Sequence, residues 1–355
     1  MFAAKINAPL TGQKPVSLRP VANWLWICAG MVFVMALVGA ITRLTESGLS
    51  IAEWNPIGGA IPPLGEAEWQ RLFAEYQATP QYQQVNHGMS LAEFKGIFWW
   101  EWIHRFWGRL IGLVFALPML WFAVTRRVKG GLLLKLFGLF ALGGLQGGIG
   151  WFMVASGLID QPNVSHYRLA LHLACAILLM ALLVYTALGV GDTRPVGRIP
   201  AAPVGLRGQA RFTFTLLAVT IIWGAFVAGL DAGLIYNECP KMGASLFPSE
   251  GLQMQPLWRN FVENHATVQF THRWLALGTA FFVLLLGFEV VRSPNVSERA
   301  QKLGYALMAM VGVQVGLGIT TLLTQVSIHP TVAHQGGALT LVALMTALIY
   351  ELRGR

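Results

Sequence analysis

Residues 98–125, FWWEWIHRFWGRLIGLVFALPMLWFAVT, combine a long apolar run with an acid, a histidine and an arginine close to its start. A helix that spans a bilayer needs about 20 predominantly apolar residues, and this stretch is long enough. Ionisable residues within such a span are costly and are by default functional candidates. The stretch therefore predicts a transmembrane helix whose first turns carry chemistry.

Seven further runs of similar length and character accompany this one. The eight predicted spans are 22–44, 98–125, 132–156, 166–190, 212–234, 270–291, 302–324 and 330–350. The 355-residue chain is 55% hydrophobic and 12% charged, about half the charged share of a typical soluble protein. The predicted fold class is therefore an all-α integral membrane protein with eight transmembrane helices.

The net charge of +9 does not indicate nucleic-acid binding, because the basic residues lie in short patches between apolar runs. Most of the 25 lysines and arginines lie in the N-terminal tail, in the loops 126–135, 191–211 and 292–302, and at the C terminus. The positive-inside rule therefore places both termini in the cytoplasm. The two long loops, 45–97 and 235–269, are then on the outer side.

Two segments outside the spans have features of their own. Residues 1–21 are polar and basic and lack the apolar core of a signal peptide, so they are predicted to form a cytoplasmic tail. In the first long loop, Glu66–Gln77 is predicted to form an amphipathic helix.

The two halves of the chain resemble each other. The string GLQGGIG at 144–150 matches GVQVGLG at 312–318, an offset of 168 residues, and IHRF at 103–106 matches THRW at 271–274 at the same offset. Residues at the start of the two long loops match at an offset of 185, because the first loop is longer. A repeat of this kind predicts two similar units.

Because each repeat holds four spans, both keep the same orientation in the membrane. The predicted architecture is two tandem four-helix bundles. The predicted domains are a cytoplasmic tail at 1–21, an N-terminal half at 22–190, a cytoplasmic linker at 191–211 and a C-terminal half at 212–355.

Four of the eight histidines share one setting: His104, His172, His272 and His334 each lie near the outer start of an even-numbered span. Each precedes the first cytoplasmic arginine by about 20 residues, or roughly 30 Å along a helix, which places all four at one depth. Pairs of histidines facing each other inside a helical bundle are typical axial ligands of haem iron. We therefore expect His104 to face His172, and His272 to face His334.

The surroundings of these histidines add to the haem hypothesis. Arg105 and Arg273 directly follow the first histidine of each pair and are candidates for holding a haem propionate. The alternative for both arginines is anchoring at the membrane interface. The glycines of the paired G-x-Q-x-G-x-G strings would let a flat macrocycle approach a helix, or would serve ordinary helix packing.

The two halves differ at one position of chemical interest. Glu101 lies one helical turn before His104, whereas the matching residue before His272 is Gln269. A site that transfers protons or stabilises a cationic intermediate needs an acid, and a structural cofactor site does not. Glu101 is therefore the candidate catalytic residue, with a solvated interfacial charge as the alternative.

Three functions use these features. An enzyme with one catalytic and one cofactor haem site explains the difference between Glu101 and Gln269. A dihaem b-type membrane electron-transfer cytochrome would use the same four histidines but gives no reason for an acid in one half only. A transporter predicts a broken helix or a charge at the midplane, and the interiors of the runs carry no charge.

The motifs together resemble the haem A synthase family over essentially the whole chain. The resemblance rests on E-x-x-H-R at Glu101–Arg105, S-G-L-S at Ser47–Ser50 with Trp54 and Pro56 after it, the paired G-x-Q strings, and His172, His272 and His334. It implies an enzyme of cytochrome oxidase assembly that oxidises the C8 methyl group of haem O to a formyl group, giving haem A.

The resemblance also implies where the two haems lie. The cofactor is expected to be haem b, bound in the C-terminal half by His272 and His334. Haem O is expected in the N-terminal half, near Glu101, His104, Arg105 and His172. The expected location is the bacterial inner membrane, with the haem sites near the periplasmic side.

The expected partners are membrane lipid, a haem O synthase and an electron-transfer protein, and a homo-oligomer is left open. Some relatives carry a cysteine pair in each long outer loop. This chain has no cysteine in 45–97 and only Cys239 in 235–269. It therefore resembles the subtype that lacks these pairs.

Overall fold

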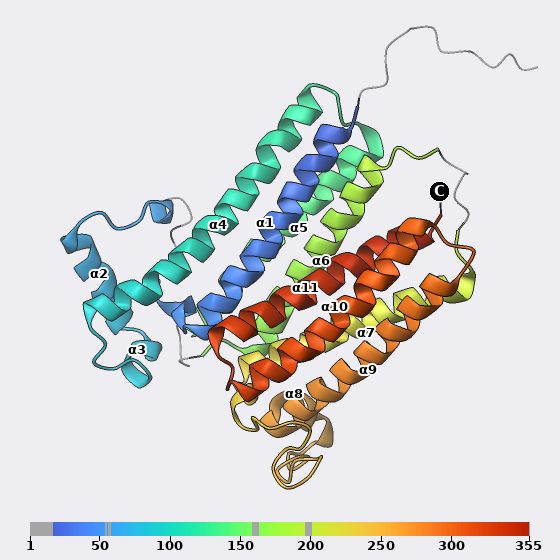
Figure 1. Ribbon diagram of the computed structural model, residues 1–355. Coiled ribbons are helices and arrows are strands. Elements are labelled where there is room, and N and C mark those ends of the chain that lie inside the picture. Colours follow the sequence, from blue (N-terminus) through green and yellow to red (C-terminus); the bar gives the residue numbers. More distant parts are fainter. Residues whose placement is uncertain (1–16, 54, 56–57, 158–162, 196–200, 355) are drawn as a thin grey trace, which may run out of the picture.

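The structure is a computed structural model that describes residues 17–53, 55, 58–157, 163–195 and 201–354 (Figure 1). These residues form helices and loops, with one isolated β-bridge between Met242 and Ser245 and no strand among them. Eight of the described helices are long and apolar enough to cross a membrane. They are α1 (Arg19–Leu44), α4 (Leu91–Val124), α5 (Gly130–Gly157), α6 (His166–Gly191), α7 (Val204–Gly229), α9 (His265–Arg292), α10 (Glu298–Leu323) and α11 (Ile328–Leu352). The prediction of an all-α protein with eight transmembrane helices is confirmed.

Short helices occupy the two long loops. The first loop contains the 3-10 turns η1 (Ser47–Leu49) and η2 (Gly58–Ala60) and the helices α2 (Glu66–Gln77) and α3 (Pro80–Gln84). The second contains η3 (Ala232–Leu234), η4 (Leu257–Arg259) and α8 (Asn260–Glu263). The predicted amphipathic helix over Glu66–Gln77 is confirmed with both of its bounds.

Helices α4 and α7 begin furthest ahead of their predicted apolar runs. Helix α4 starts seven residues before position 98, because Ser90 and Glu93 form a capping box that fixes its first turn. Helix α7 starts at Val204 and not at 212, so the segment between α6 and α7 is shorter than the predicted linker of 191–211. Arg207 and Arg211 are helical although they precede the apolar run, because a helix does not have to begin where its apolar run begins.

Helices α1 and α7 end in the same way. Each is followed by an acid with a left-handed backbone, Glu46 with φ 53° and Asp231 with φ 51°, and then by a 3-10 turn. A left-handed residue breaks the helical hydrogen-bond ladder and redirects the chain. The two long outer loops therefore start from matching corners.

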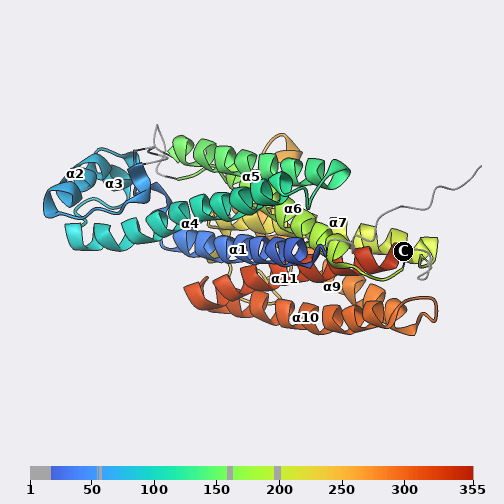
Figure 2. The same cartoon turned by 90° about the horizontal axis from the view of Figure 1, so that it is seen from above.

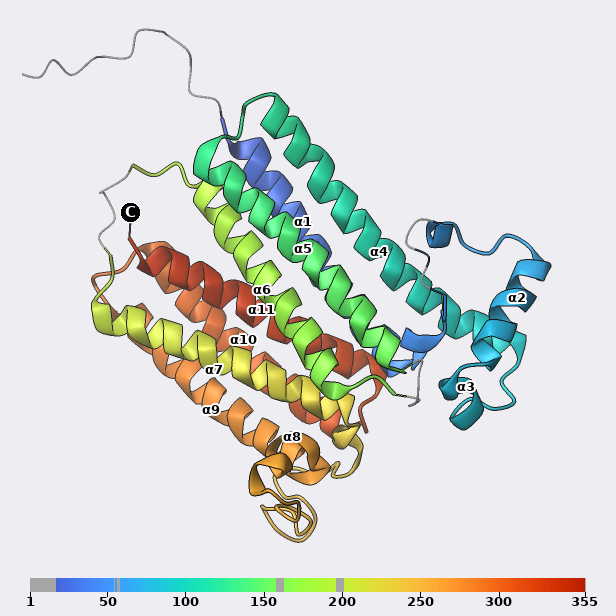
Figure 3. The same cartoon turned by 180° about the vertical axis from the view of Figure 1, so that it is seen from behind.

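The long helices pack in two sets of four. In the first set, α1 and α5 each contact both α4 and α6; in the second, α7 and α10 each contact both α9 and α11. Figures 1 and 3 show the two sets side by side, and Figure 2 shows them from above. The sets meet through α1 and α6 on one side and α7 and α11 on the other.

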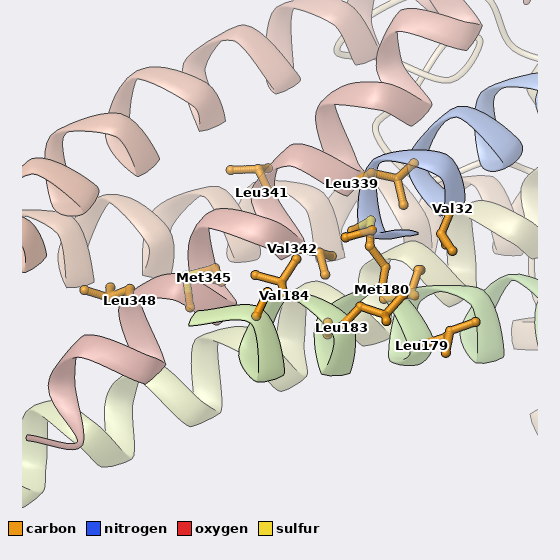
Figure 4. Packing of buried hydrophobic residues seen from close by; sticks show 14 of the residues in the cluster. Val32, Leu179, Met180, Leu183, Val184, Leu339, Leu341, Val342, Met345 and Leu348 are labelled. Atoms are coloured by element: carbon orange, nitrogen blue, oxygen red, sulfur yellow. The ribbon is translucent and has the colours of Figure 1, made fainter. Parts of the chain in front are cut away.

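The contact between the two sets is an apolar core of buried side chains from α1, α6 and α11 (Figure 4). Its labelled members include Val32, Leu179, Met180, Leu183, Val184, Leu339, Val342, Met345 and Leu348. In a membrane, lipid tails are as apolar as these side chains, so close van der Waals packing rather than exclusion of water holds the sets together.

A buried polar cluster joins the sets at the end where α1 begins and α11 ends (Figure 1). Arg194 pairs with Asp192 at 2.9 Å and with Glu351 of α11 at 2.7 Å, and Tyr350 donates a hydrogen bond to Asp192 at 3.0 Å. The hydrogen bonds to Asp192 and Glu351 raise the pKa of Arg194 above its ordinary value, so it keeps its charge. The cluster ties the segment after α6 to the last turn of α11.

The first long loop rests on the extended start of α4, which projects beyond α1 (Figure 1). Trp69 and Tyr76 of α2 are buried against Phe94 and Phe98 of α4, and the rings of Trp69 and Phe98 are 4.9 Å apart. Aromatic contacts of this kind hold the loop in place beside Glu101.

Candidate functional site

The four predicted histidines lie on α4, α6, α9 and α11, near the ends of these helices that face the two long loops. His172, His272 and His334 each follow the first residue of their helix by about two turns. His104 lies further into α4 because this helix starts early. All four histidine residues are half-buried.

The structure brings the histidines together in the predicted pairs. His104 and His172 lie close enough to interact electrostatically, and so do His272 and His334. In each set the two helices that carry a pair lie opposite one another in the ring of packed helices. Each pair therefore faces the inside of its own set.

The ring orientation of His272 fits a haem ligand. Its Nδ1 lies 3.1 Å from the carbonyl oxygen of Thr220, and only a protonated nitrogen can donate to a carbonyl. The proton therefore sits on Nδ1, which leaves the lone pair of Nε2 for a metal. Haem and metal ligands commonly show this arrangement, with the far nitrogen donating to a backbone carbonyl.

The glutamines of the two G-x-Q strings contact the second histidine of each pair. Gln146 Nε2 donates to the carbonyl oxygen of His172 at 3.1 Å and lies 3.2 Å from its Nδ1. Gln314 Nε2 donates to the carbonyl oxygen of His334 at 3.0 Å. The matching carbonyl contacts made from α5 and α10 follow the sequence repeat. From the sequence, these strings were of interest for their glycines, and the contacts made by the glutamines were not predicted.

A pair of histidines suits haem iron better than a bare metal ion. Haem supplies four ligands from its porphyrin and needs only two from the protein, whereas a structural metal site needs about four protein ligands. Within the described ranges, no group of three or more His, Cys, Asp or Glu side chains could hold a metal ion. Two histidines in each set match the two protein ligands that haem iron takes, so the residues present fit the haem hypothesis.

Glu101 is buried, with 2% of its surface exposed, and both carboxylate oxygens are engaged. Oε2 accepts hydrogen bonds from Ser50 Oγ and from the backbone N–H of Ile51, each at 2.7 Å. Oε1 accepts from Arg105, one turn further along α4. A buried carboxylate needs such donors, since an uncompensated charge in the interior is costly. Glu101 is thus not a solvated interfacial charge.

Gln269 occupies the same place in the second set, also with 2% of its surface exposed. Its Nε2 donates to the carbonyl oxygen of Ala232 at 2.8 Å, and its Oε1 accepts from Arg273 at 3.0 Å. In both halves this residue connects the histidine helix to the start of the long outer loop. The connection is made by a charged acceptor in one half and by a neutral donor in the other.

The two arginines that follow the histidines donate hydrogen bonds to backbone carbonyl oxygens of the same two long outer loops. Arg105 donates to the carbonyl oxygens of Ile51 at 2.8 Å and Glu53 at 3.1 Å. Arg273 donates to those of Tyr236 at 2.8 Å and Glu238 at 2.9 Å. These contacts with the outer loops were not predicted from the sequence, and the propionate role of both arginines stays a prediction.

A cavity of about 380 Å³ lies between the first long loop and α4. Phe98 and Trp102 form part of its apolar wall, and Arg105 and Arg109 contribute positive charge. The 58–65 segment of the loop closes its other side. The cavity therefore offers an amphipathic space next to the residue that follows His104.

The structure describes the three cysteines but not the tryptophan and proline that follow the S-G-L-S string. Cys28 and Cys175 are buried, Cys239 is exposed, and all three are free thiols. Trp54 and Pro56, which follow the S-G-L-S string, lie outside the described residues, as does most of the predicted tail.

Comparison with known proteins gives one consistent result. The family model described as "Cytochrome oxidase assembly protein" matches residues 22–346. The chain is 53% identical to the "Heme A synthase" of Rhodospirillum centenum over 98% of this chain and 92% of the relative. It is 46% identical to the "Heme A synthase" of Nitrosospira multiformis, over 97% and 96%, and 47% identical to that of Granulibacter bethesdensis, over 94% and 87%. The similarity thus extends over all eight transmembrane helices.

Proposed function

The chain belongs to the cytochrome oxidase assembly family that includes the heme A synthases, and from this premise we propose that it converts haem O to haem A. The reaction would oxidise the C8 methyl group of haem O to a formyl group. The observation that carries the proposal is the presence of two histidine pairs, one with the buried Glu101 beside it, in a chain similar to heme A synthases throughout its length. Of the functions that the sequence left open, the comparisons favour the enzyme.

The C-terminal half, residues 212–355, is the proposed cofactor site, with haem b bound by His272 and His334. The Nδ1–H of His272 is held by Thr220, which supports ligation through Nε2. Bound in this way, haem b would supply one-electron redox chemistry. Gln269 is neutral, so this half contains no acid beside its first histidine.

The N-terminal half, residues 22–190, is the proposed substrate site, with His104 and His172 as ligands of the haem O iron. With water as the oxygen source, conversion of a methyl group (–CH3) to a formyl group (–CHO) would release four protons and four electrons, so protons must leave the reacting carbon and the electrons must pass to an acceptor. Glu101 is the carboxylate proposed to take them, from its position one turn from His104. The ion pair with Arg105 would hold this carboxylate in place.

The proposed orientation places both termini and the 191–211 linker in the cytoplasm of a bacterial inner membrane, and the histidine pairs near the periplasmic side. The distribution of basic residues supports it. Reporter fusions after residues 75 and 250 should show a periplasmic location, and fusions at 130, 200 and the C terminus a cytoplasmic one. A cytoplasmic signal from the fusion after residue 75 would contradict this orientation.

The function itself is tested by pigment analysis. Expression of this chain in a bacterium that makes haem O but no haem A should produce extractable haem A, and the purified protein should contain haem b. Cells with the empty vector provide the control. If the expressing cells contain haem O and the folded protein but no haem A, the proposed activity is wrong.

The proposed partners follow from the reaction. A haem O synthase would deliver the substrate, and an electron-transfer protein would accept the electrons that the oxidation releases. Membrane lipid would surround the eight helices. Whether the protein forms a homo-oligomer is tested by measuring the mass of the purified protein in detergent.

A further inference from the structure

Each of the four histidines lies directly against a glycine of a neighbouring helix. A β-carbon placed on Gly39, Gly150, Gly224 or Gly318 would lie 3.2, 3.0, 3.0 or 2.9 Å from the ring of His104, His172, His272 or His334, respectively. These distances are shorter than an ordinary van der Waals contact between carbon atoms. We call Gly39, Gly150, Gly224 and Gly318 the histidine-facing glycines.

The histidine-facing glycines obey the internal repeat. Gly39 in α1 and Gly224 in α7 are 185 residues apart, the offset that relates the starts of the two long loops. Gly150 in α5 and Gly318 in α10 are 168 residues apart, the offset that relates the G-x-Q strings. The contacts therefore occur twice in the structure, once in each half, between corresponding helices.

Other glycines of the same helices lack this contact. A β-carbon on Gly30 of α1, Gly138 of α5 or Gly208 of α7 would meet no atom within 4 Å outside its own helix. Among the described glycines of α1 and α5, such a close approach to another helix is found only at the turn that faces the imidazole, whereas α7 has a second one at its end, where a β-carbon on Gly229 would lie 2.5 Å from His166 Cβ. Close helix approach through small residues is general in membranes, but here the group that approaches is a ring and not a backbone.

We propose that the histidine-facing glycines are positioning residues that set the ring orientation of the haem ligands, an inference that rests on the proposed function. A methyl group at Gly224 would push His272 Cε1 and strain the hydrogen bond from Nδ1 to Thr220. The ring lies at the end of a flexible side chain, so it would turn and leave the backbone in place. Turning the ring would also change the direction of Nε2, the nitrogen that the Thr220 contact leaves available to iron.

The rings meet their glycines in two orientations. His172, His272 and His334 present Cε1 as the nearest atom, whereas His104 presents Nε2. In all four contacts the position that a β-carbon would occupy is left to the histidine ring.

The test compares Gly224→Ala with Gly208→Ala, two identical changes in α7. The purified proteins are measured for haem b per polypeptide, for the low-spin and high-spin fractions by absorption and electron paramagnetic resonance, and for helix content by circular dichroism. Gly224→Ala should retain haem about 10–100-fold less tightly, the usual effect of losing a group that orients a metal ligand, or should convert it to high spin. Gly208→Ala should match the unmodified protein.

The N-terminal half supplies the second arm. Gly39→Ala and Gly150→Ala should leave the spectrum of the resident haem b unchanged and should weaken binding of haem O added to the purified protein. Gly30→Ala and Gly138→Ala, in the same helices, should leave both properties unchanged. A change in the haem b spectrum of Gly39→Ala equal to that of Gly224→Ala would overturn the assignment of these glycines to separate sites.

Two outcomes separate this inference from the proposed function. If His272→Ala loses haem b while Gly224→Ala behaves like Gly208→Ala, the positioning role is wrong and the haem site stands. If His272→Ala keeps its haem b and its spectrum, the proposed cofactor site fails and this inference fails with it. Alanine favours a helix over glycine, so Gly224→Ala should not lower the helix content through helix propensity. If this variant loses helix content together with haem, the cause is a disturbed fold and the positioning role is overturned.

Discussion

Glu101→Gln is expected to lower haem A formation by about 10²–10⁴-fold, the usual contribution of a positioned acid–base group. An amide can accept a hydrogen bond but cannot take a proton at neutral pH. Cells that depend on this variant should accumulate haem O, or a partly oxidised intermediate if only the second step fails. Their haem content is measured by extraction and chromatography, and the haem b of the purified variant should stay at the level of the unmodified protein.

The structure also predicts a stability effect that has to be separated from the catalytic one. The amide introduced by Glu101→Gln could still accept from Arg105, as Gln269 accepts from Arg273 in the other half. The N–H of Ile51 would lose its acceptor, which costs about 1–3 kcal/mol where the group is buried. Ser50→Ala removes a neighbouring hydrogen bond and keeps the carboxylate, so it serves as the control. It should lower the melting temperature slightly and retain haem A formation.

Two further variants sharpen the conclusion about Glu101. Glu101→Asp keeps a carboxylate and should recover part of the rate that the glutamine variant loses. Gln269→Glu should create no second active site, because its carboxylate would face the carbonyl oxygens of Ala232 and Tyr236. Haem A formation at the normal rate in Glu101→Gln would show that this residue only connects α4 to the outer loop.

Removal of either ligand in the C-terminal half is expected to abolish or strongly lower bound haem b. His272→Ala and His334→Ala each delete one axial ligand, so any haem that remains should be five-coordinate and high-spin. Haem per polypeptide, the absorption spectrum and electron paramagnetic resonance of the purified variants measure both effects.

The same two helices provide matched controls. His265 is an exposed histidine at the start of α9, and His329 is an exposed histidine at the start of α11. His265→Ala and His329→Ala should keep the haem content and spectrum of the unmodified protein. The ligand assignment fails if the variants at His272 and His334 are indistinguishable from these two.

Much of the helical architecture could be predicted from the sequence, because a bilayer imposes a length on each apolar run. All eight predicted spans are helices, and the boundaries of α1, α5, α6 and α11 lie within a few residues of the predictions. The boundaries of α4 and α7 differ more from the predictions, because hydropathy indicates where the hydrocarbon layer ends and not where a helix begins or ends. The internal repeat was visible because matching letters recur at constant offsets.

The common depth of the four histidines could also be predicted, because depth follows from spacing along a helix, and the repeat then suggested one pair for each half. Each ligand candidate lies at a similar distance from the basic end of its span, so the four had to lie near one level. The tertiary structure places His104 near His172 and His272 near His334, in agreement with that expectation.

The sequence by itself thus determined the eight apolar helices, their repeat, the histidine pairs and the exchange of Glu101 for Gln269, since these depend on periodicity and on spacing along the chain. Only the tertiary structure showed that Glu101 is buried against Ser50 and Ile51, about 50 residues away. It alone showed that Gly39 and Gly224 touch histidines on other helices. Such contacts depend on how one helix face is turned toward another, and that rotation is set by the packing of all the helices together and not by the residues of any one span.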